Sequence, residues 1–199
     1  MFSKPYTFLF IGRSGCGKGT QAEFLIKYLK ANDKRPVLYL YAGNKMRELA
    51  ERKNNLTSQI TKKVLLEGGK QPDFLAIWYW SNELVEKMTE DVHLVIDGSP
   101  RTAMEAEIWD EAFEFYGRKD IKPIYVEVST KWATEKLLKR KRFDDTEERI
   151  RNRMAYFDKI VYPAIEYYKN KSRNKLIKIN GEPAIEEVHK EIIEKLHLL

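Results

Sequence analysis

A glycine-rich segment directly follows a short apolar run near the start of the chain. The segment reads FIGRSGCGKGTQ over residues 10–21 and places four glycines, a lysine and a threonine behind the run TFLFI at residues 7–11. Glycines allow backbone N–H groups to turn inward around an anion, and a helix that begins near Lys18 adds the positive end of its dipole. A strand before such a loop and a helix after it are the context in which it cradles phosphate. We therefore predict a phosphate-binding loop.

The lysine and the threonine of this loop are residue types that bind nucleotide phosphates and their metal. Gly12, Gly17 and Lys18 match the pattern G-x-x-x-x-G-K, in which the lysine amine reaches the outer phosphates. Gly19 stands where a hydroxyl residue usually follows, and the hydroxyl comes one position later, on Thr20. Thr20 is therefore a candidate magnesium ligand.

The single cysteine, Cys16, lies inside the same loop. A thiol near a helix N-terminus can have a lowered pKa and act as a nucleophile. No histidine stands near Cys16 in the sequence to serve as its base, so we interpret it as a small side chain that fills a variable position of the loop. One cysteine excludes an internal disulfide and fits a reducing compartment.

Short apolar runs recur along the chain, and each is followed by a longer segment with helical periodicity. The runs lie at residues 7–11, 36–41, 92–97, 122–128 and 175–179. Near-continuous apolar runs suit strands that are buried on both faces. We therefore predict an α/β three-layer sandwich with a roughly five-stranded parallel sheet, and the G-x-x-x-x-G-K loop after the first strand indicates the P-loop NTPase type.

Composition and charge narrow the class of protein. The chain has 199 residues, of which 43% are hydrophobic and 33% charged, which fits one globular domain. Its longest apolar run is far shorter than the ~20 residues of a membrane-spanning helix, and no secretion signal opens the chain, so we expect a cytoplasmic protein with no membrane partner. The net charge of +6 implies attraction to polyanions: nucleic acid, a membrane surface or nucleotide phosphates.

The loop sequence GRSGCGKGTQAEFL resembles the adenylate kinase family of nucleoside monophosphate kinases, whose loop ends G-K-G-T-Q. Further segments are similar to the family in the same order: AGNKMR at 42–47, VIDGSPRT at 95–102, LLKRKRFDDTEERIRNRM at 137–154 and INGEPAIEEV at 179–188. The resemblance implies one domain over residues 1–199, with a core of residues 1–43, 90–136 and 155–199. It also implies a nucleoside-monophosphate-binding insertion at about residues 44–89 and a very short lid at about residues 137–154.

The resemblance also implies the reaction, a reversible transfer of the γ-phosphoryl group of ATP to a nucleoside monophosphate, by default AMP, with Mg²⁺ as cofactor. Such a transfer brings several negative charges together, so the site needs positioned cations more than a covalent nucleophile. The implied catalytic residues are Lys18, Arg101, Arg142, Arg153 and Asp144. The implied ATP-binding residues are Gly15, Cys16, Gly17, Lys18, Gly19, Thr20, Arg140 and Gly181. Asp144 and Asp145 resemble the lid carboxylates that hold the arginines in place.

The acceptor nucleotide is expected to bind on the other side of the transferred group. The implied acceptor-binding residues are Ala42, Gly43, Arg47, Gln71, Gly98, Arg101 and Glu105. Arg47 and Arg101 are expected to grip the acceptor phosphate, because guanidinium groups bind phosphate oxygens bidentately. Asp97 ends the third predicted strand and is expected by the resemblance to order the water shell of Mg²⁺, with a helix N-cap as its structural alternative.

The acceptor-base pocket departs from the family. Adenylate kinases usually carry threonine at the position of Ala42, whereas UMP/CMP kinases carry alanine there, as this chain does. Asn44 replaces an aspartate of the family. Glu105 stands where AMP-specific members have a glutamine. An ionised glutamate can only accept hydrogen bonds, which suits guanine better than adenine, unless Glu105 faces solvent on its helix. The aromatic run at residues 77–80 predicts core packing, with stacking of Trp78 or Trp80 on the acceptor base, aided by Gln71, as the alternative.

Two other functions compete with an adenylate kinase. One is a UMP/CMP- or GMP-type kinase with a changed acceptor base. The other is a P-loop nucleotide-binding protein or ATPase that acts on nucleic acid, although the acidic cluster directly after the basic run KRKR argues against a surface for a phosphate backbone. We expect ATP and a nucleoside monophosphate as partners, no nucleic acid, and a monomer. Only Lys141 separates Arg140 from Arg142, and so short a lid predicts poorer water exclusion and easier ATP hydrolysis.

Overall fold

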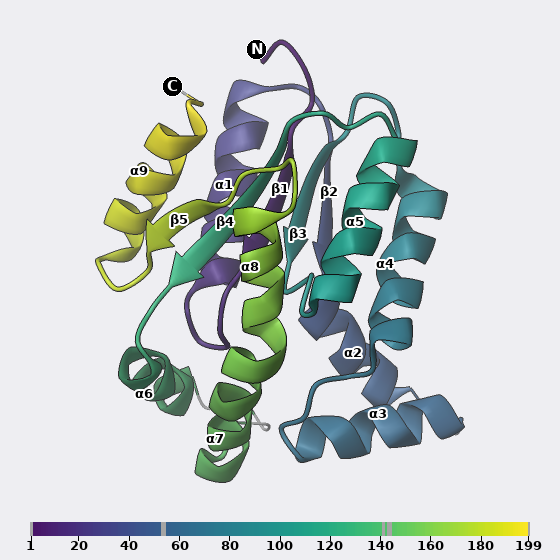
Figure 1. Ribbon diagram of the computed structural model, residues 1–199, viewed down its shortest axis with the longest axis vertical. Coiled ribbons are helices and arrows are strands. Elements are labelled where there is room, and N and C mark those ends of the chain that lie inside the picture. The colour runs from purple at the N-terminus through teal and green to yellow at the C-terminus, as the bar shows by residue number, and fades with distance from the viewer. Residues whose placement is uncertain (1, 53–54, 141, 143–144, 199) are drawn as a thin grey trace.

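The computed structural model describes residues 2–52, 55–140, 142 and 145–198, which fold around a five-stranded sheet (Figure 1). The strands are β1 (Thr7–Ile11), β2 (Val37–Tyr41), β3 (His93–Asp97), β4 (Ile121–Glu127) and β5 (Ile177–Asn180). They lie in the order β2-β3-β1-β4-β5, and every neighbouring pair is parallel. The predicted sheet is confirmed, with each predicted strand matched to within two residues at either end.

The alternation of side chains in β1 explains the three layers. Phe8 and Phe10 pack with α1 (Lys18–Asn32) and α9 (Ile185–Leu196) on one face of the sheet. Leu9 and Ile11 pack on the other face. The helices that cover this face are α4 (Asp73–Lys87), α5 (Ala103–Phe115) and α8 (Tyr162–Asn170). Every residue of β1 is buried, and each large apolar side chain so placed stabilises the fold by about 1.5–3 kcal/mol.

Two groups of helices lie beyond the carboxyl ends of the strands. α2 (Ala42–Glu51) begins at the residue after β2, and α3 (Leu56–Leu66) follows it. α6 (Thr130–Arg140) and α7 (Glu147–Tyr156) come after β4, and a π-helical turn at Phe157–Val161 joins α7 to α8. Figure 1 shows the two groups on opposite sides of the carboxyl edge, so any ligand at that edge lies between them. No helix in the described ranges is long and apolar enough to cross a membrane.

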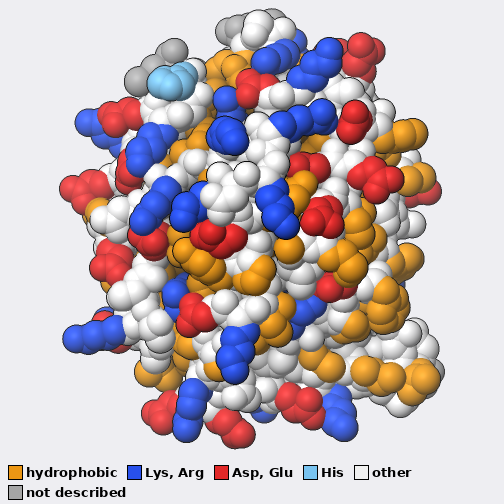
Figure 2. All heavy atoms as spheres, viewed as in Figure 1, with side chains coloured by type: hydrophobic (Ala, Val, Ile, Leu, Met, Phe, Trp, Pro, Cys, Tyr) orange, Lys and Arg blue, Asp and Glu red, His pale blue; other side chains and the backbone are white. Residues whose placement is uncertain are grey.

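Charged side chains of both signs are mixed on the face shown in Figure 2. Lys and Arg side chains are interspersed there with Asp and Glu side chains and with hydrophobic ones. A phosphate backbone is bound most favourably by a stripe of one sign, because each contact releases counterions. The face in view has no such stripe.

Candidate active site

The phosphate-binding loop joins β1 to α1 and opens toward the carboxyl edge of the sheet. Gly15 and Gly17 have φ angles of 85° and 90°, which side-chain-bearing residues rarely adopt. Gly17 caps α1 without a side-chain hydrogen bond, which leaves the N–H groups of the first turn available to an anion. The Lys18 ammonium lies over the loop, with Nζ 3.4 Å from the Arg13 carbonyl oxygen. The loop therefore has the geometry expected for a phosphate cradle.

Asp97 ends β3 directly beside this loop, and its side chain is buried. Its Oδ2 accepts a hydrogen bond from the Tyr39 hydroxyl at 3.2 Å, whereas the buried Oδ1 has no partner among the described residues. A Cβ atom at Gly19 would lie 3.0 Å from Oδ2, so the glycine that departs from the usual loop pattern leaves room for this carboxylate. Burial raises the pKa of Asp97, and the nearby Lys18 ammonium only partly opposes that shift. A buried acceptor with an open lone pair fits a metal-bound water.

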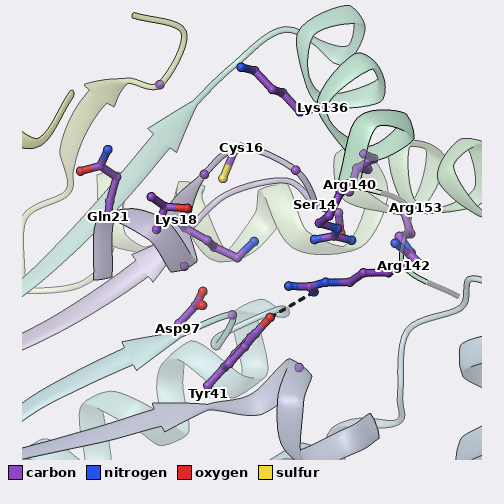
Figure 3. Close-up of a pocket in the computed structure, with 18 of the residues that line it drawn as sticks. Ser14, Cys16, Lys18, Gln21, Tyr41, Asp97, Lys136, Arg140, Arg142 and Arg153 are labelled. Atoms are coloured by element: carbon purple, nitrogen blue, oxygen red, sulfur yellow. Dashed lines mark hydrogen bonds between the residues drawn. The ribbon is translucent and has the colours of Figure 1, made fainter. Parts of the chain in front are cut away.

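A cavity of about 560 Å³ opens at the carboxyl edge (Figure 3). The predicted site residues that line it are Gly15, Cys16, Gly17, Lys18, Gly19, Thr20, Gly43, Arg47, Gln71, Asp97, Gly98, Arg101, Arg140, Arg142, Arg153 and Gly181. Ala42 and Glu105 line a smaller adjoining cavity that shares Gln71, Gly98 and Arg101 with the first. Asp144 lies outside the described residues. The structure therefore brings together every predicted site residue that it describes.

Cys16 is part of the phosphate-binding loop but is almost completely buried, with 1% of its surface exposed. Burial raises the pKa of its thiol, and this effect outweighs the attraction of Lys18. A thiol that stays protonated is a poor nucleophile, so the structure agrees with a packing role.

Asp145 organises the arginines of the short lid. Its fully buried carboxylate accepts two hydrogen bonds from Arg140, both at 2.8 Å, and one from Arg153 Nη1 at 2.7 Å. Burial by itself raises the pKa of Asp145, but these guanidinium groups outweigh burial and lower it below its ordinary value. Arg140 ends α6 and Arg153 lies in α7, so Asp145 ties the two lid helices together.

Glu105 supports the acceptor side of the site from within the protein. Only 1% of its surface is exposed, so the alternative that Glu105 faces solvent is wrong. Oε1 accepts from Ser99 Oγ at 2.6 Å and from Trp80 Nε1 at 3.2 Å, and Oε2 accepts from the backbone N–H of Arg101 at 2.6 Å. Burial raises the pKa of Glu105, and the hydrogen bonds oppose that shift. Glu105 thus fixes the backbone from which Arg101 reaches the cavity.

Neither tryptophan of the aromatic run reaches the acceptor pocket. Trp80 is buried and stacks on Trp109 with ring centroids 3.9 Å apart, which confirms core packing. Trp78 is 48% exposed and lines neither cavity. Residues two apart on a helix point to nearly opposite sides, so only one of the two could face the sheet. The alternative of base stacking is therefore wrong for both side chains.

Gln71 and Asn44 differ in their relation to the pocket. The Gln71 side chain is buried, its Nε2 donates to the Thr61 carbonyl oxygen at 3.0 Å, and its Oε1 has no partner among the described residues. The exposed Asn44 side chain donates to Glu48 Oε1 at 2.7 Å and lines neither cavity. Gln71 therefore offers a free acceptor to a ligand, whereas Asn44 stabilises its own helix.

Tyr39 and Tyr41 are among the cavity-lining residues that the sequence did not predict. The Tyr39 hydroxyl donates to Asp97, and the Tyr41 hydroxyl accepts from Arg47. Their spacing of two in a strand places both side chains on one face, next to the carboxyl edge where ligands bind. That spacing is the signal that could have identified them.

Comparison with known proteins gives a consistent result. The family model described as adenylate kinase matches residues 10–173. The chain is 30% identical over 188 residues to an adenylate kinase of Prochlorococcus marinus, covering 94% of this chain and 97% of that protein. It is 31% identical over 185 residues to an adenylate kinase of Trichodesmium erythraeum, covering 90% and 92%. It is 29% identical over 188 residues to adenylate kinase 1 of a Nostoc species, covering 92% and 95%.

Proposed function

The chain belongs to the adenylate kinase family, and we propose that it transfers the γ-phosphoryl group of ATP reversibly to AMP, forming two molecules of ADP. One observation carries this proposal: Lys18, Arg47 and Arg101 line the same cavity as Arg142 and Arg153 of the lid. Cations from so many separate segments suit a reaction in which the phosphates of two nucleotides meet.

Each cation has a place in the proposed mechanism. Lys18 and the amides of the loop hold the donor phosphates, and Arg47 and Arg101 align the acceptor phosphate for in-line attack. Arg142 and Arg153 offset the charge that develops on the transferring group. The attacking oxygen of a nucleoside monophosphate is already anionic, so no general base is required. The residues act by positioning and by charge.

Magnesium is the cofactor that this chemistry implies. Bound with ATP, it would neutralise the outer phosphates as charge develops. The buried Oδ1 of Asp97, which has no partner among the described residues, fits a water on such an ion, and Thr20 lines the same cavity. Asp97 and Thr20 are thus the proposed holders of the metal.

The acceptor pocket presents a hydrogen-bond acceptor to the base. Gln71 Oε1 is buried and has no partner among the described residues, whereas both oxygens of Glu105 already accept hydrogen bonds from the protein. The amino group of adenine can donate a hydrogen bond to Gln71 Oε1. The pocket therefore fits AMP as the acceptor, in agreement with the adenylate kinase family.

We further propose that residues 44–89 and 137–154 close over the two nucleotides, and that the enzyme acts as a monomer in the cytoplasm. The two groups of helices flank the cavity, as closure requires. The very short lid favours some hydrolysis of ATP when no acceptor is bound.

The direct test is a coupled assay with ATP, Mg²⁺ and one of AMP, GMP, CMP, UMP or dTMP, in which diphosphate formation is followed. We expect turnover with AMP far above the others. Faster turnover with GMP, CMP or UMP would assign a different acceptor. Release of inorganic phosphate with no acceptor phosphorylated would contradict a transferase and favour a P-loop hydrolase.

Replacing Glu105 with glutamine tests the support of Arg101. The amide keeps one acceptor oxygen, so one of the buried donors on Ser99, Trp80 or Arg101 loses its partner, at a cost of about 1–3 kcal/mol in the free energy of unfolding. We expect this loss in urea unfolding together with a several-fold rise in KM for AMP. Glu107→Gln, on an exposed position of the same helix, is the control and should change neither. Faster AMP turnover in Glu105→Gln without loss of stability would instead make position 105 a reader of the base.

A further inference from the structure

The Tyr41 hydroxyl lies where the acceptor side of the site meets the lid. Tyr41 is the last residue of β2, and its oxygen accepts a hydrogen bond from Arg47 Nη2 at 3.1 Å. Arg142 Nη1 lies 3.4 Å from the same oxygen, from a position 101 residues further along the chain (Figure 3). One neutral oxygen thus joins two guanidinium groups to which the proposed mechanism gives different phosphates.

The packing around Tyr41 holds its ring in one place. A Cβ atom at Gly43 would lie 3.0 Å from Cε2 of the ring, so the ring uses the space that this glycine leaves. Tyr39 stacks against the ring with centroids 6.1 Å apart, and the Arg47 guanidinium lies 5.5 Å from its centroid. The direction of the hydroxyl is therefore set by the core side of the site and not by the lid.

The charges around this hydroxyl resemble those around a bound phosphate oxygen. Burial by itself raises the pKa of Tyr41, but Arg142 and Arg47 outweigh burial and hold the pKa below its ordinary value. The hydroxyl receives two donors and has no acceptor for its own hydrogen among the described residues. That hydrogen is available to a phosphate oxygen in the cavity, which Tyr41 lines.

We infer that Tyr41 is a positioning residue for phosphoryl transfer, whose hydroxyl couples Arg47 of the acceptor site to Arg142 of the lid and donates its hydrogen to a phosphate oxygen between them. This inference rests on the proposed function, because the ligand is the phosphate of a nucleotide in that site. A single fixed oxygen holds both guanidinium groups around one point before substrate arrives. It also gives a very short lid a contact on the core side of the cavity.

The test is a double-mutant cycle with Tyr41→Phe, Arg142→Ala and the double variant. Phenylalanine keeps the ring and removes only the hydroxyl. We expect Tyr41→Phe to lower kcat/KM for AMP about 10- to 100-fold, through both kcat and KM, while KM for ATP changes less than twofold. In the Arg142→Ala background the same change should lower kcat/KM less than about threefold, because the group through which Tyr41 acts is absent. Tyr28→Phe is the matched control, since its hydroxyl bonds the Leu198 carbonyl oxygen outside the cavity.

The possible outcomes separate this inference from the proposed function. Wild-type kcat and KM values retained in Tyr41→Phe would overturn the inference, and so would equal losses in both backgrounds, because the hydroxyl would then act without Arg142. A matching loss in Tyr28→Phe would mean that removal of any tyrosine hydroxyl disturbs the fold, which also overturns it. If the wild-type chain transfers no phosphoryl group, the proposed function fails, and the same cycle is then measured as AMP affinity by calorimetry. Additive changes in that affinity overturn the inference, and non-additive ones support it.

Discussion

Replacing Lys18 with methionine is expected to lower kcat for ADP formation by about 100- to 1,000-fold. Lys18 begins α1 in the phosphate loop, and its ammonium lies close to the buried Asp97 and to the loop carbonyl of Arg13. Methionine has a similar length but no charge, so the negative charge that develops during transfer loses a preorganised partner. The measurement is the steady-state rate at saturating ATP and AMP, compared with the wild type.

A second lysine of the same helix provides the control for this change. Lys27 is exposed and lines no part of the cavity, so Lys27→Met removes one charge from α1 without touching the site. We expect its kcat to stay within about twofold of the wild type. Equal rates for Lys18→Met and the wild type would show that the loop does not bind the transferred phosphates in the proposed way.

Replacing Asp145 with asparagine is expected to damage both the activity and the stability of the lid. The Asp145 carboxylate is fully buried and accepts hydrogen bonds from Arg140 and Arg153. Asparagine has one acceptor oxygen in place of two and no negative charge, so both guanidinium groups lose part of their partner. Removing one partner of a buried ion pair lowers the free energy of unfolding by about 3–5 kcal/mol. We expect a loss of about 3 kcal/mol, because the Arg140 side chain is partly exposed. Misplaced arginines should also lower kcat/KM by about 100-fold. Urea unfolding and steady-state kinetics measure the two effects.

The control for this variant is another Arg–Asp pair near the lid. Asp158 lies 3.4 Å from Arg13 and its side chain is 65% exposed, so Asp158→Asn should cost less than about 1 kcal/mol. An Asp145→Asn protein as stable and as active as Asp158→Asn would contradict the role that we assign to the buried carboxylate.

The pH dependence of the Asp145 variant follows from the direction of the pKa shift. The folded state lowers the pKa of Asp145 below the ordinary value of 3.8, so its contribution to stability is fully present above 3.8. That contribution is lost as the pH falls through the lowered pKa. The difference in unfolding free energy between the wild type and Asp145→Asn should therefore stay constant from neutral to mildly acidic pH and shrink only below 3.8. A difference that already disappears near neutral pH would contradict this assignment.

The burial of Glu105 could not be predicted from its position in a helix. Its charge favoured a solvent-facing position, whereas its place in α5 next to the buried Ala106 and Trp109 allowed a buried one. The donors that stabilise the carboxylate come from Trp80 on α4 and from Ser99 and Arg101 in the turn before α5. Helical periodicity contains no information about such partners, so the sequence left both alternatives open.

The features that depend only on short stretches of the chain could be predicted from the sequence alone. These features are the five strands, the helix that begins at Lys18 and the loop before it. They depend on the apolar pattern and on the backbone preferences of consecutive residues, both of which the sequence shows directly. The resemblance of the ordered segments to one family then identified the glycines of the loop and most of the cations that line the cavity, but not Tyr39 or Tyr41.

Only the tertiary structure decided which of these residues act on one another. The resemblance already implied that Asp145 holds lid arginines, but neither the contact of Glu105 with the backbone of Arg101 nor the meeting of Arg47 with Arg142 at Tyr41 was implied by it. Each contact exists because separate helices and strands pack at one edge of the sheet. The energy of a hydrogen bond depends on the distance and direction between its partners, and folding sets both for residues that are distant in sequence.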